Sequence, residues 1–582
     1  MFTYENILDL VVRWAEDALP QQVLDPARDD DGAFIAGGWC LWEVRGIPAP
    51  DVSNHAHAIA CLAYAYLAVG SRYFGDAAML DRTLRAIRFL RSAQRPTGLI
   101  DLPSTNFESP PDTAFAVQLL APVVEMARRV GTPESLRIAG DLGEFIRTGA
   151  AGIVGRGFHT ANHRWVISAA LAQATSLFPG LAPVAMPYFS RIMAEGIDLN
   201  EDGEYTERST VVYNAVCDRS LRFMADYLNR PDLLAFVRKN LDSMLRLLHA
   251  DGTAVTSTSV REDRGRRIRP LSLADSFYDM ARRDKNGVWA HAADMLVGGD
   301  FAAEARAWPF DPVPGWLFGV YALHPEYRHD ALGRKPLPDE YSVFLPAAGL
   351  WRVRRGDLSA TAASGHTTAF AVRYGDVSLK AVKLFGSYIV SAIFSADEMA
   401  PDGQGEAVRG VSMRHRGDHR KLPGYDLPLN RPVPYGSFHD VAAERARWTQ
   451  PPMDIVLDIH EVPGGFDLHA RTEGGLDRIM FQIEFCFDGP GEWETDDALV
   501  AAENGQVVFL KAGYGVFHRG RHGLRIGPGA ISHRVPQMRN TEPEPDSFRV
   551  LMTFVTPVDH AFDIRYGAWS MATGGLLASF ER

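Results

Sequence analysis

The chain has 582 residues, of which 46% are apolar and 23% charged, and 60 basic against 72 acidic side chains give a net charge of −12. That length exceeds what one ordinary hydrophobic core accommodates and predicts two or more domains. The acidic balance argues against a general nucleic-acid partner, because phosphates require clustered Lys and Arg. A local cationic pocket on such a chain could still hold an anionic substrate.

The sequence lacks several targeting and cysteine patterns that mark particular classes of protein. The chain has neither an apolar run of about 18 residues nor a basic segment followed by an apolar one at its N-terminus, so we predict no membrane partner and a cytoplasmic location. Its four cysteines are scattered and form no CxxC pair. This excludes a disulfide framework and a thiolate zinc site.

Residues 1–320 show helical periodicity throughout. The apolar residues recur at helical spacing, and Pro or Gly bounds many of the segments. The predicted helices are 7–14, 56–69, 79–89, 113–130, 134–146, 162–178, 182–197, 211–228, 232–248, 272–283 and 288–297. A long succession of helix pairs without an exact sequence repeat predicts a closed α/α toroid rather than a solenoid.

The second half of the chain changes to a period of two. A segment rich in proline and aromatic residues, 321–340, is predicted to be a linker, and residues 341–582 are predicted to form an antiparallel β-sandwich. Within that domain, residues from about 400 to 447 have little periodicity. A loop of that length inside a compact domain is often functional.

One helix start is unusually polar. Asn162, His163, Arg164 and Trp165 stand side by side at the start of an otherwise apolar helix, and the polar segment 202–209 follows some forty residues later, just before Tyr213. Taken alone, the first group could be a capped helix end with a satisfied histidine. The combination of His, Tyr and Asn with a nearby polar loop favours two walls of one active site.

An Asn-His pair opening a helix, then Asp-Gly-Glu-aromatic-x-Glu-x-Ser leading to a tyrosine, resembles the heparinase II/III-like and oligo-alginate-lyase-like polysaccharide lyases. The resemblance implies an α/α toroid followed by a β-sandwich. It also implies catalytic roles for Asn162, His163, Tyr213 and His366. In that family the catalytic tyrosine lies some fifty residues after the histidine of the Asn-His pair, and a further catalytic histidine lies about a hundred and fifty residues beyond the tyrosine. The spacings here agree, since 213 − 163 = 50 and 366 − 213 = 153.

The sequence departs from that family at the histidines of the second domain. The relatives carry an H-x-H motif there, and its second histidine helps to bind a structural zinc. Thr368 stands at that position here. We therefore predict neither a metal nor another cofactor, although His415, His419, His439 and His460 leave a different metal site in the second domain open.

The predicted reaction is β-elimination from a uronic acid. Asn162 and His163 would hydrogen-bond the substrate carboxylate and stabilise an enolate-like intermediate. Tyr213 would take the C5 proton, protonate the leaving O4, or do both, once nearby cations lower its pKa. His366 is the predicted second acid–base group, because the ordinary pKa of histidine lies near neutrality.

Five further residues are predicted to contact the substrate. Arg208 would bind its carboxylate through a planar fork of donors, and Tyr205 is the second choice for the catalytic tyrosine. Arg164 and Trp165, which differ from what the family leads us to expect beside the Asn-His pair, are predicted to reflect a different substrate. Asn106 belongs to a polar loop at a helix entrance.

Two other functions stay open at this stage. A glycoside hydrolase would need two carboxylates flanking the bond, and Asp112, Asp202, Glu204 and Glu207 are available. A non-catalytic glycan-binding protein is the other. The predicted partner is an acidic oligosaccharide or polysaccharide. The sequence leaves open the particular uronic acid, endo or exo action, syn or anti elimination, and whether copies of the chain form a homo-oligomer.

Overall fold

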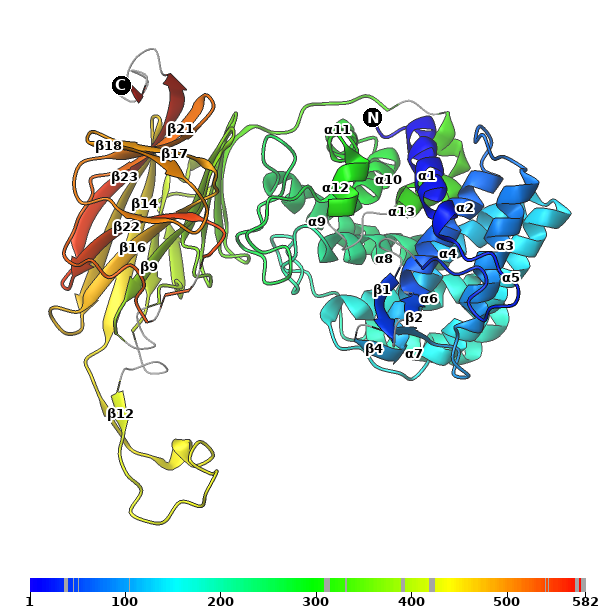
Figure 1. Cartoon of the computed structure of the whole chain (residues 1–582), viewed down its shortest axis with the longest axis horizontal. Coiled ribbons are helices and arrows are strands. Elements are labelled where there is room, and N and C mark those ends of the chain that lie inside the picture. Colours follow the sequence, from blue (N-terminus) through cyan, green and yellow to red (C-terminus); the bar gives the residue numbers. More distant parts are fainter. Residues whose placement is uncertain are drawn as a thin grey trace. The chain divides into compact units, whose positions relative to one another are not determined.

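The computed structural model divides into two compact units (Figure 1). It describes residues 1–35, 40–44, 47–50, 52–103, 105–307, 314–329, 332–388, 393–417, 424–539, 541–542, 544–570 and 575–576. The first unit comprises Met1–Leu248 and Gly252–Leu337, and the second comprises His249–Asp251 and Pro338–Arg582. No helix in the described ranges is both long enough and apolar enough to span a bilayer.

The first unit is a helical toroid. Its helices are α1 (Tyr4–Ala18), α2 (Val52–Leu67), α3 (Ala77–Ser92), α4 (Pro110–Val130), α5 (Pro133–Ile153), α6 (Ala161–Leu177), α7 (Ala182–Met193), α8 (Tyr213–Leu228), α9 (Leu234–Arg246), α10 (Ala274–Asp284), α11 (Gly287–Leu296), α12 (Phe301–Ala307) and α13 (Pro314–Leu323). Two short hairpins, β1 (Cys40–Val44) with β2 (Ile47–Pro50) and β3 (Ile100–Leu102) with β4 (Asn106–Ser109), accompany them.

Helix contacts explain the closed ring. The even-numbered helices α2, α4, α6, α8 and α10 pack in succession, and α13 packs against α10 as well as α1, α2 and α4, which joins the end of the series to its start. Helices α4 and α6 bury residues on nearly every side, as expected of helices enclosed by neighbours. This arrangement is the predicted α/α toroid.

Local signals set the helix ends. Helix α4 begins at Pro110, three residues before the predicted start, because Ser109 caps the backbone N–H of Asp112 and two prolines occupy the first helical positions. Helix α13 ends inside the predicted linker 321–340, and a 3₁₀ turn at Pro325–Arg328 follows it. Since α13 is apolar on all sides, its sequence has no amphipathic contrast to mark it as a helix.

The second unit is the predicted β-sandwich. One sheet has the order β10-β11-β14-β15-β23-β21-β20-β17-β18, with β24 beside β23, and the other has the order β19-β22-β16-β9-β8-β7-β6-β5. Among the described residues, every pairing between named strands is antiparallel except that of β19 with β22, and the isolated bridge between Ile531 and Thr553 is also parallel. Apolar residues such as Trp351, Phe370, Phe466 and Phe517 form the core of this unit.

The strand bounds follow the alternation in the sequence. They are β5 (Glu340–Leu345), β6 (Leu350–Arg355), β7 (Leu358–Ala363), β8 (Phe370–Tyr374), β9 (Val377–Gly386), β10 (Glu398–Pro401), β11 (Gly410–His415), β12 (Gly424–Asp426), β13 (Arg447–Thr449), β14 (Met453–Val462), β15 (Gly465–Gly474), β16 (Met480–Phe487), β17 (Gly491–Thr495), β18 (Ala498–Ala502), β19 (Val507–Phe509), β20 (Gly515–Arg519), β21 (His522–Gly527), β22 (Phe548–Val555), β23 (Asp559–Ser570) and β24 (Gly575–Leu576).

Candidate active site

The start of α6 is satisfied by a side chain from a distant loop. Thr160, the residue before the helix, makes no capping bond to the backbone. Glu207 takes that place: its Oε1 accepts from the backbone N–H of Asn162 at 3.0 Å and from Asn162 Nδ2 at 2.7 Å. A carboxylate is favourable there, because the first N–H groups of a helix lack partners and carry partial positive charge.

Arg261 links Glu207 to Tyr213. Arg261 Nη1 lies 3.1 Å from Glu207 Oε2, and Arg261 Nη2 donates to the Tyr213 hydroxyl at 3.0 Å. The guanidinium lies over the Tyr213 ring, 4.4 Å from its centroid. The structure thus joins Asn162 to Tyr213 through Glu207 and Arg261. We call these four residues, with His163, the Glu207 cluster.

A buried aspartate holds the two loops of this cluster together. Asp263 accepts from Ser209 Oγ at 3.2 Å and from the backbone N–H of Val211 at 3.1 Å, and it also accepts from the Ser259 hydroxyl. Ser209 Oγ in turn accepts from the backbone N–H of Tyr213, the first residue of α8. These bonds bring Arg261 and Tyr213 together.

His163 is uncharged at neutral pH. Burial, with smaller contributions from His159 and Arg261, lowers its pKa to about 3. The ring meets His159 edge to face at 4.7 Å and Phe115 of α4 at 6.1 Å. Its Nδ1 is buried without a hydrogen-bond partner. A neutral imidazole can accept a proton or donate one hydrogen bond, but it supplies no positive charge to a carboxylate.

The amide of Asn162 has its donors already engaged. Nδ2 donates to Glu207 and, at 3.1 Å, to Thr160 Oγ1, whereas the buried Oδ1 has no partner. The group that this side chain offers is therefore an acceptor. The predicted role of donating to a substrate carboxylate needs revision, since an acceptor pairs with a carboxyl group only when that group carries a proton.

The predicted lowering of the Tyr213 pKa is wrong. Burial raises the pKa of Tyr213 above its ordinary value, and the opposing effect of Arg261 is smaller. The reason is that the half-buried ring places its hydroxyl where a phenolate loses hydration. Tyr213 is therefore protonated at neutral pH, which suits an acid better than a base.

Three residues predicted to contact substrate make contacts within the protein. Trp165 is fully buried, and its Nε1 donates to Asp198 at 2.7 Å. Arg164 lies over the Trp165 ring and pairs with Asp198 at 3.1 Å and with Glu195. Tyr205 is also buried, and its hydroxyl donates to a carboxylate of α8, that of Asp218, at 2.9 Å. The buried rings of Trp165 and Tyr205 have no face left for a sugar, so we do not include these two residues in the site. The predicted substrate contact of Arg164 stays a prediction.

The remaining predicted residues have the following contacts and positions within their own units. Arg208, with a positive φ of 47°, pairs with Glu204 at 3.4 Å. Asn106 on β4 donates to Asp112 at 3.1 Å near the start of α4. His366 lies in the loop between β7 and β8 of the sandwich unit and is buried. Its predicted catalytic role stays a prediction.

Two residues of the cluster were not in the predicted site. Glu207 counted only as one of several carboxylates. Arg261 is the first of five arginines between positions 261 and 269, a run that usually forms an exposed surface and could also guide an anionic sugar. Neither position has a periodic signal, because their partners are distant in the chain. The one available sign was the motif itself, which includes Glu207.

A metal site is not evident in the described residues. Asp226, Asp279 and His324 form the one group there whose ligand atoms lie close enough to hold an ion. Arg283 already fills this position: it donates to both aspartates and lies 3.0 Å from His324 Nε2. The donors therefore fit an arginine rather than an added cation.

The fold defines a class of proteins, those that combine an α/α toroid with a β-sandwich. No protein-family model and no curated protein matches the chain by sequence. Among solved structures, a crystal structure of heparinase III has a TM-score of 0.54 and 10% identity, covering 98% of this chain and 86% of that one. A second heparinase III structure has a TM-score of 0.50 and 10% identity, covering 96% and 84%. The chain has the fold of heparinase-like polysaccharide lyases.

Proposed function

We propose that the chain is a polysaccharide lyase that cleaves a uronic-acid-containing glycan by β-elimination. The observation that carries the proposal is the Glu207 cluster, in which Asn162 and Tyr213 contact one Glu–Arg pair. His163 follows Asn162 in the chain and is near enough to Arg261 for that charge to contribute to lowering its pKa. The heparinase-like fold supports it, since the solved relatives named above are heparinases.

The first requirement is to make the C5 proton acidic by offsetting the adjacent carboxylate charge. Arg261 is the permanent cation beside the Tyr213 hydroxyl. Asn162 is fully buried, so the proposal requires that substrate binding exposes its unpaired Oδ1, which would then accept from the substrate carboxyl group in its protonated form. Both residues are fixed by the same carboxylate, that of Glu207, so their positions are set before substrate binds.

The second requirement is a base and an acid. His163, neutral and with Nδ1 unpaired, is the proposed base, and an anionic substrate raises its low pKa toward the working range. The electron pair of the C5–H bond forms the C4=C5 double bond, the C4–O4 bond breaks, and O4 takes the Tyr213 hydroxyl proton. His366, the acid–base group predicted from the sequence, is tested separately by His366→Ala.

The decisive assay follows the ultraviolet absorbance of the unsaturated 4,5-uronate during incubation with sulfated and unsulfated uronate polymers and oligosaccharides. We expect the chromophore with at least one of them. Tyr213→Phe should lower kcat by about 10²–10⁴-fold, the typical contribution of acid–base catalysis, without changing the unfolding midpoint. The matched control is Tyr73→Phe, whose hydroxyl donates to Glu16 outside the cluster. Near-normal activity of Tyr213→Phe would remove Tyr213 from the mechanism.

A glycoside hydrolase is the second candidate, and one observation favours it. Burial raises the pKa of Glu204 to about 7, against the lowering effect of Arg208 and with a further increase from Asp202. A carboxylic acid protonated near neutrality is what a hydrolase uses as general acid. New reducing ends without the chromophore, lost in Glu204→Gln, would select this function. The absence of any cleavage would select a glycan-binding protein.

A further inference from the structure

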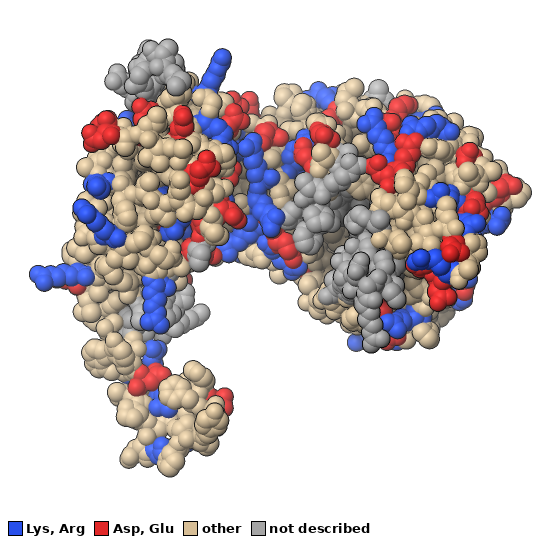
Figure 2. Space-filling view, viewed as in Figure 1, with Lys and Arg blue, Asp and Glu red and all other residues tan. Residues whose placement is uncertain are grey.

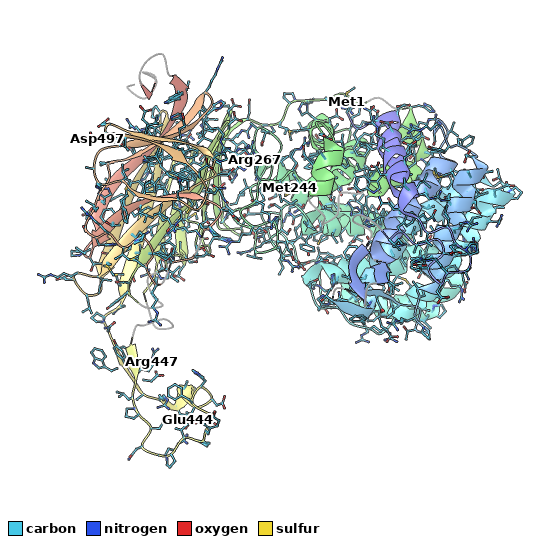
Figure 3. The ribbon with its side chains drawn as sticks, in the orientation of Figure 1. Met1, Met244, Arg267, Glu444, Arg447 and Asp497 are labelled. Atoms are coloured by element: carbon cyan, nitrogen blue, oxygen red, sulfur yellow. The ribbon has the colours of Figure 1, made fainter. Side chains whose placement is uncertain are left out.

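A protruding arm interrupts the second unit. Residues 424–449, which we call the arm, leave the sandwich as the short pair β12–β13 and stand out from its two sheets (Figure 1). In Figure 3, Arg447 marks the base of the arm and Glu444 lies further along it. The arm lies largely within the stretch of about 400 to 447 whose lack of periodicity suggested a functional loop.

The arm buries almost nothing of itself. All its residues are described, and Val441 is the only buried one, at 9% exposure. An isolated two-stranded hairpin is marginally stable in water, and here the ladder is only three residue pairs long with one added bond from Leu427 N–H to Ala446. The arm therefore has few internal contacts to stabilise its shape, and we expect it to pack against another surface.

The exposed side chains of the arm are large and apolar. The arm holds five of the twenty exposed large hydrophobic residues in the described chain. They are Tyr425 (66% exposed), Leu427 (45%), Tyr435 (106%), Phe438 (58%) and Trp448 (57%). Tyr425 stacks on Trp448, with the ring centroids 5.8 Å apart, so the two rings present one continuous face. Exposed apolar patches of this kind mark interaction sites.

The charges of the arm decide the kind of partner. It carries three arginines and three acidic residues, so its net charge is 3 − 3 = 0. Two of the arginines are paired within the arm, Arg431 with Glu444 and Arg447 with Asp426 at 3.1 Å. Figure 2 accordingly shows the arm as a mostly uncharged surface. A polyanionic glycan or an anionic membrane would need unpaired cations there, so a protein surface fits better.

We propose that the arm binds a second copy of this chain, each copy receiving the arm of the other across a two-fold axis. Aromatic side chains bury ~150–250 Å² each when fully covered, so the arm offers on the order of 500 Å² at its observed exposure. Two exchanged arms and the surfaces that receive them then reach roughly 2,000 Å², within the range of stable dimers. Dimers with two-fold symmetry are also the commonest oligomers.

Sedimentation equilibrium of the full-length chain tests the proposal. We expect a mass twice that of the 64.2 kDa chain at micromolar concentrations. A variant in which an Asn-Gly turn joins Asp426 directly to Arg447, a hairpin connection compatible with β12–β13, should sediment as a monomer with unchanged circular dichroism and unfolding midpoint. A wild-type monomer, or a dimer that survives the shortening, overturns the proposal.

A second variant leaves the length of the arm unchanged. Tyr425→Ser combined with Tyr435→Ser and Trp448→Ser should also give the monomer, whereas Leu499→Ser, which changes an equally exposed residue of β18 (65%), should leave the dimer intact. Wild-type monomers that bind neutral or anionic lipid vesicles, or uronate polymers, only when the arm is present would assign the arm to that ligand and refute the dimer. None of these outcomes depends on lyase activity.

Discussion

Two groups of arginines and carboxylates in the helical unit differ in how completely their atoms are paired. The first, which we call the Asp275 network, joins α8 to α10. Arg219 and Arg222 both pair with Asp275, and Arg222 and Arg283 both pair with Asp279. The side chains of Arg222 and of both aspartates are at most 3% exposed. Burying ions costs free energy, and full pairing offsets that cost.

The Glu207 cluster is built from the same residue types with a different result. Its arginine, Arg261, is 26% exposed, and the cluster leaves Asn162 Oδ1 and His163 Nδ1 buried without partners. Unpaired buried polar atoms are destabilising, and these two are atoms of the cluster that a bound ligand could pair. The contrast teaches that the pairing of the polar atoms, more than their number, separates a structural network from a candidate site.

The largest expected effect concerns the Asp275 network. Asp275→Ala leaves Arg219 and Arg222 buried without their shared carboxylate and should lower the free energy of unfolding by about 3–5 kcal/mol. Asp232→Ala, which breaks an exposed pair with Arg230, is the control and should change it by about 0–1 kcal/mol. Urea titration measures both. Equal small losses would show that the network is not structural.

These two groups also differ in what the sequence reveals. Asp275, Asp279 and Arg283 are four residues apart on one helix, and Arg219 and Arg222 are three apart on another, so each set lies on one face. Such spacing can be recognised in the sequence alone. The Glu207 cluster instead joins a helix start to two loops, and the family motif marks Asn162, His163, Glu207 and Tyr213 but not Arg261.

The fold was predictable because it, too, depends on residue spacing that can be recognised in the sequence. Periods of 3.6 and 2 separate the toroid from the sandwich, and both predictions agree with the structure. The role of Trp165 was not predictable, because an indole beside an Asn-His pair looks the same in sequence whether it is exposed or buried. Its contact with Asp198 decides the matter, and that aspartate lies on a segment with no periodicity.

The Glu207→Gln variant tests whether the Glu207 carboxylate positions Arg261 and Asn162. The substitution removes the charge that holds Arg261 and weakens the hold on Asn162. Misplacement of catalytic groups by about 1 Å can cost ~10²-fold in rate. We therefore expect kcat to fall by that order, with KM changing much less and the pH profile of kcat shifting. Glu262→Gln, which changes the exposed partner of Arg261 at 3.4 Å, is the control. Unchanged kcat in Glu207→Gln would contradict the positioning role.

The pH dependence of stability should have opposite signs at two histidines, His163 of the Glu207 cluster and His324, whose Nε2 lies 3.0 Å from Arg283 of the Asp275 network. Burial lowers the pKa of His324, but Asp226 and Asp279 outweigh it and raise that pKa above 6.5. Its stabilisation is therefore complete below pH 6.5 and is lost as the pH rises through the folded pKa. Burial lowers the pKa of His163 from 6.5 to about 3, so its neutral form supports the fold above pH 6.5 and this support is lost as the pH falls toward 3.

Unfolding free energies of His324→Asn and His163→Asn, measured against the wild type from pH 4 to 8, separate the two histidines. The cost of His324→Asn should be greatest at the acid end and should decrease as the pH rises. As the pH falls below 6.5, the free energy of unfolding of the wild type should decrease relative to that of His163→Asn. Parallel curves would mean that the two environments do not differ as the contacts indicate.

The smallest effect is expected at Arg164, which stands next to His163 in the chain but is paired like the structural network. Its guanidinium contacts Glu195, Asp198 and the Trp165 ring, so little of it is available to a substrate. Arg164→Gln should leave kcat/KM near the wild-type value and lower the free energy of unfolding by about 1 kcal/mol. A large rise in KM with unchanged stability would return Arg164 to the substrate-binding role that the sequence predicted. It would also show that complete pairing does not by itself identify a structural residue.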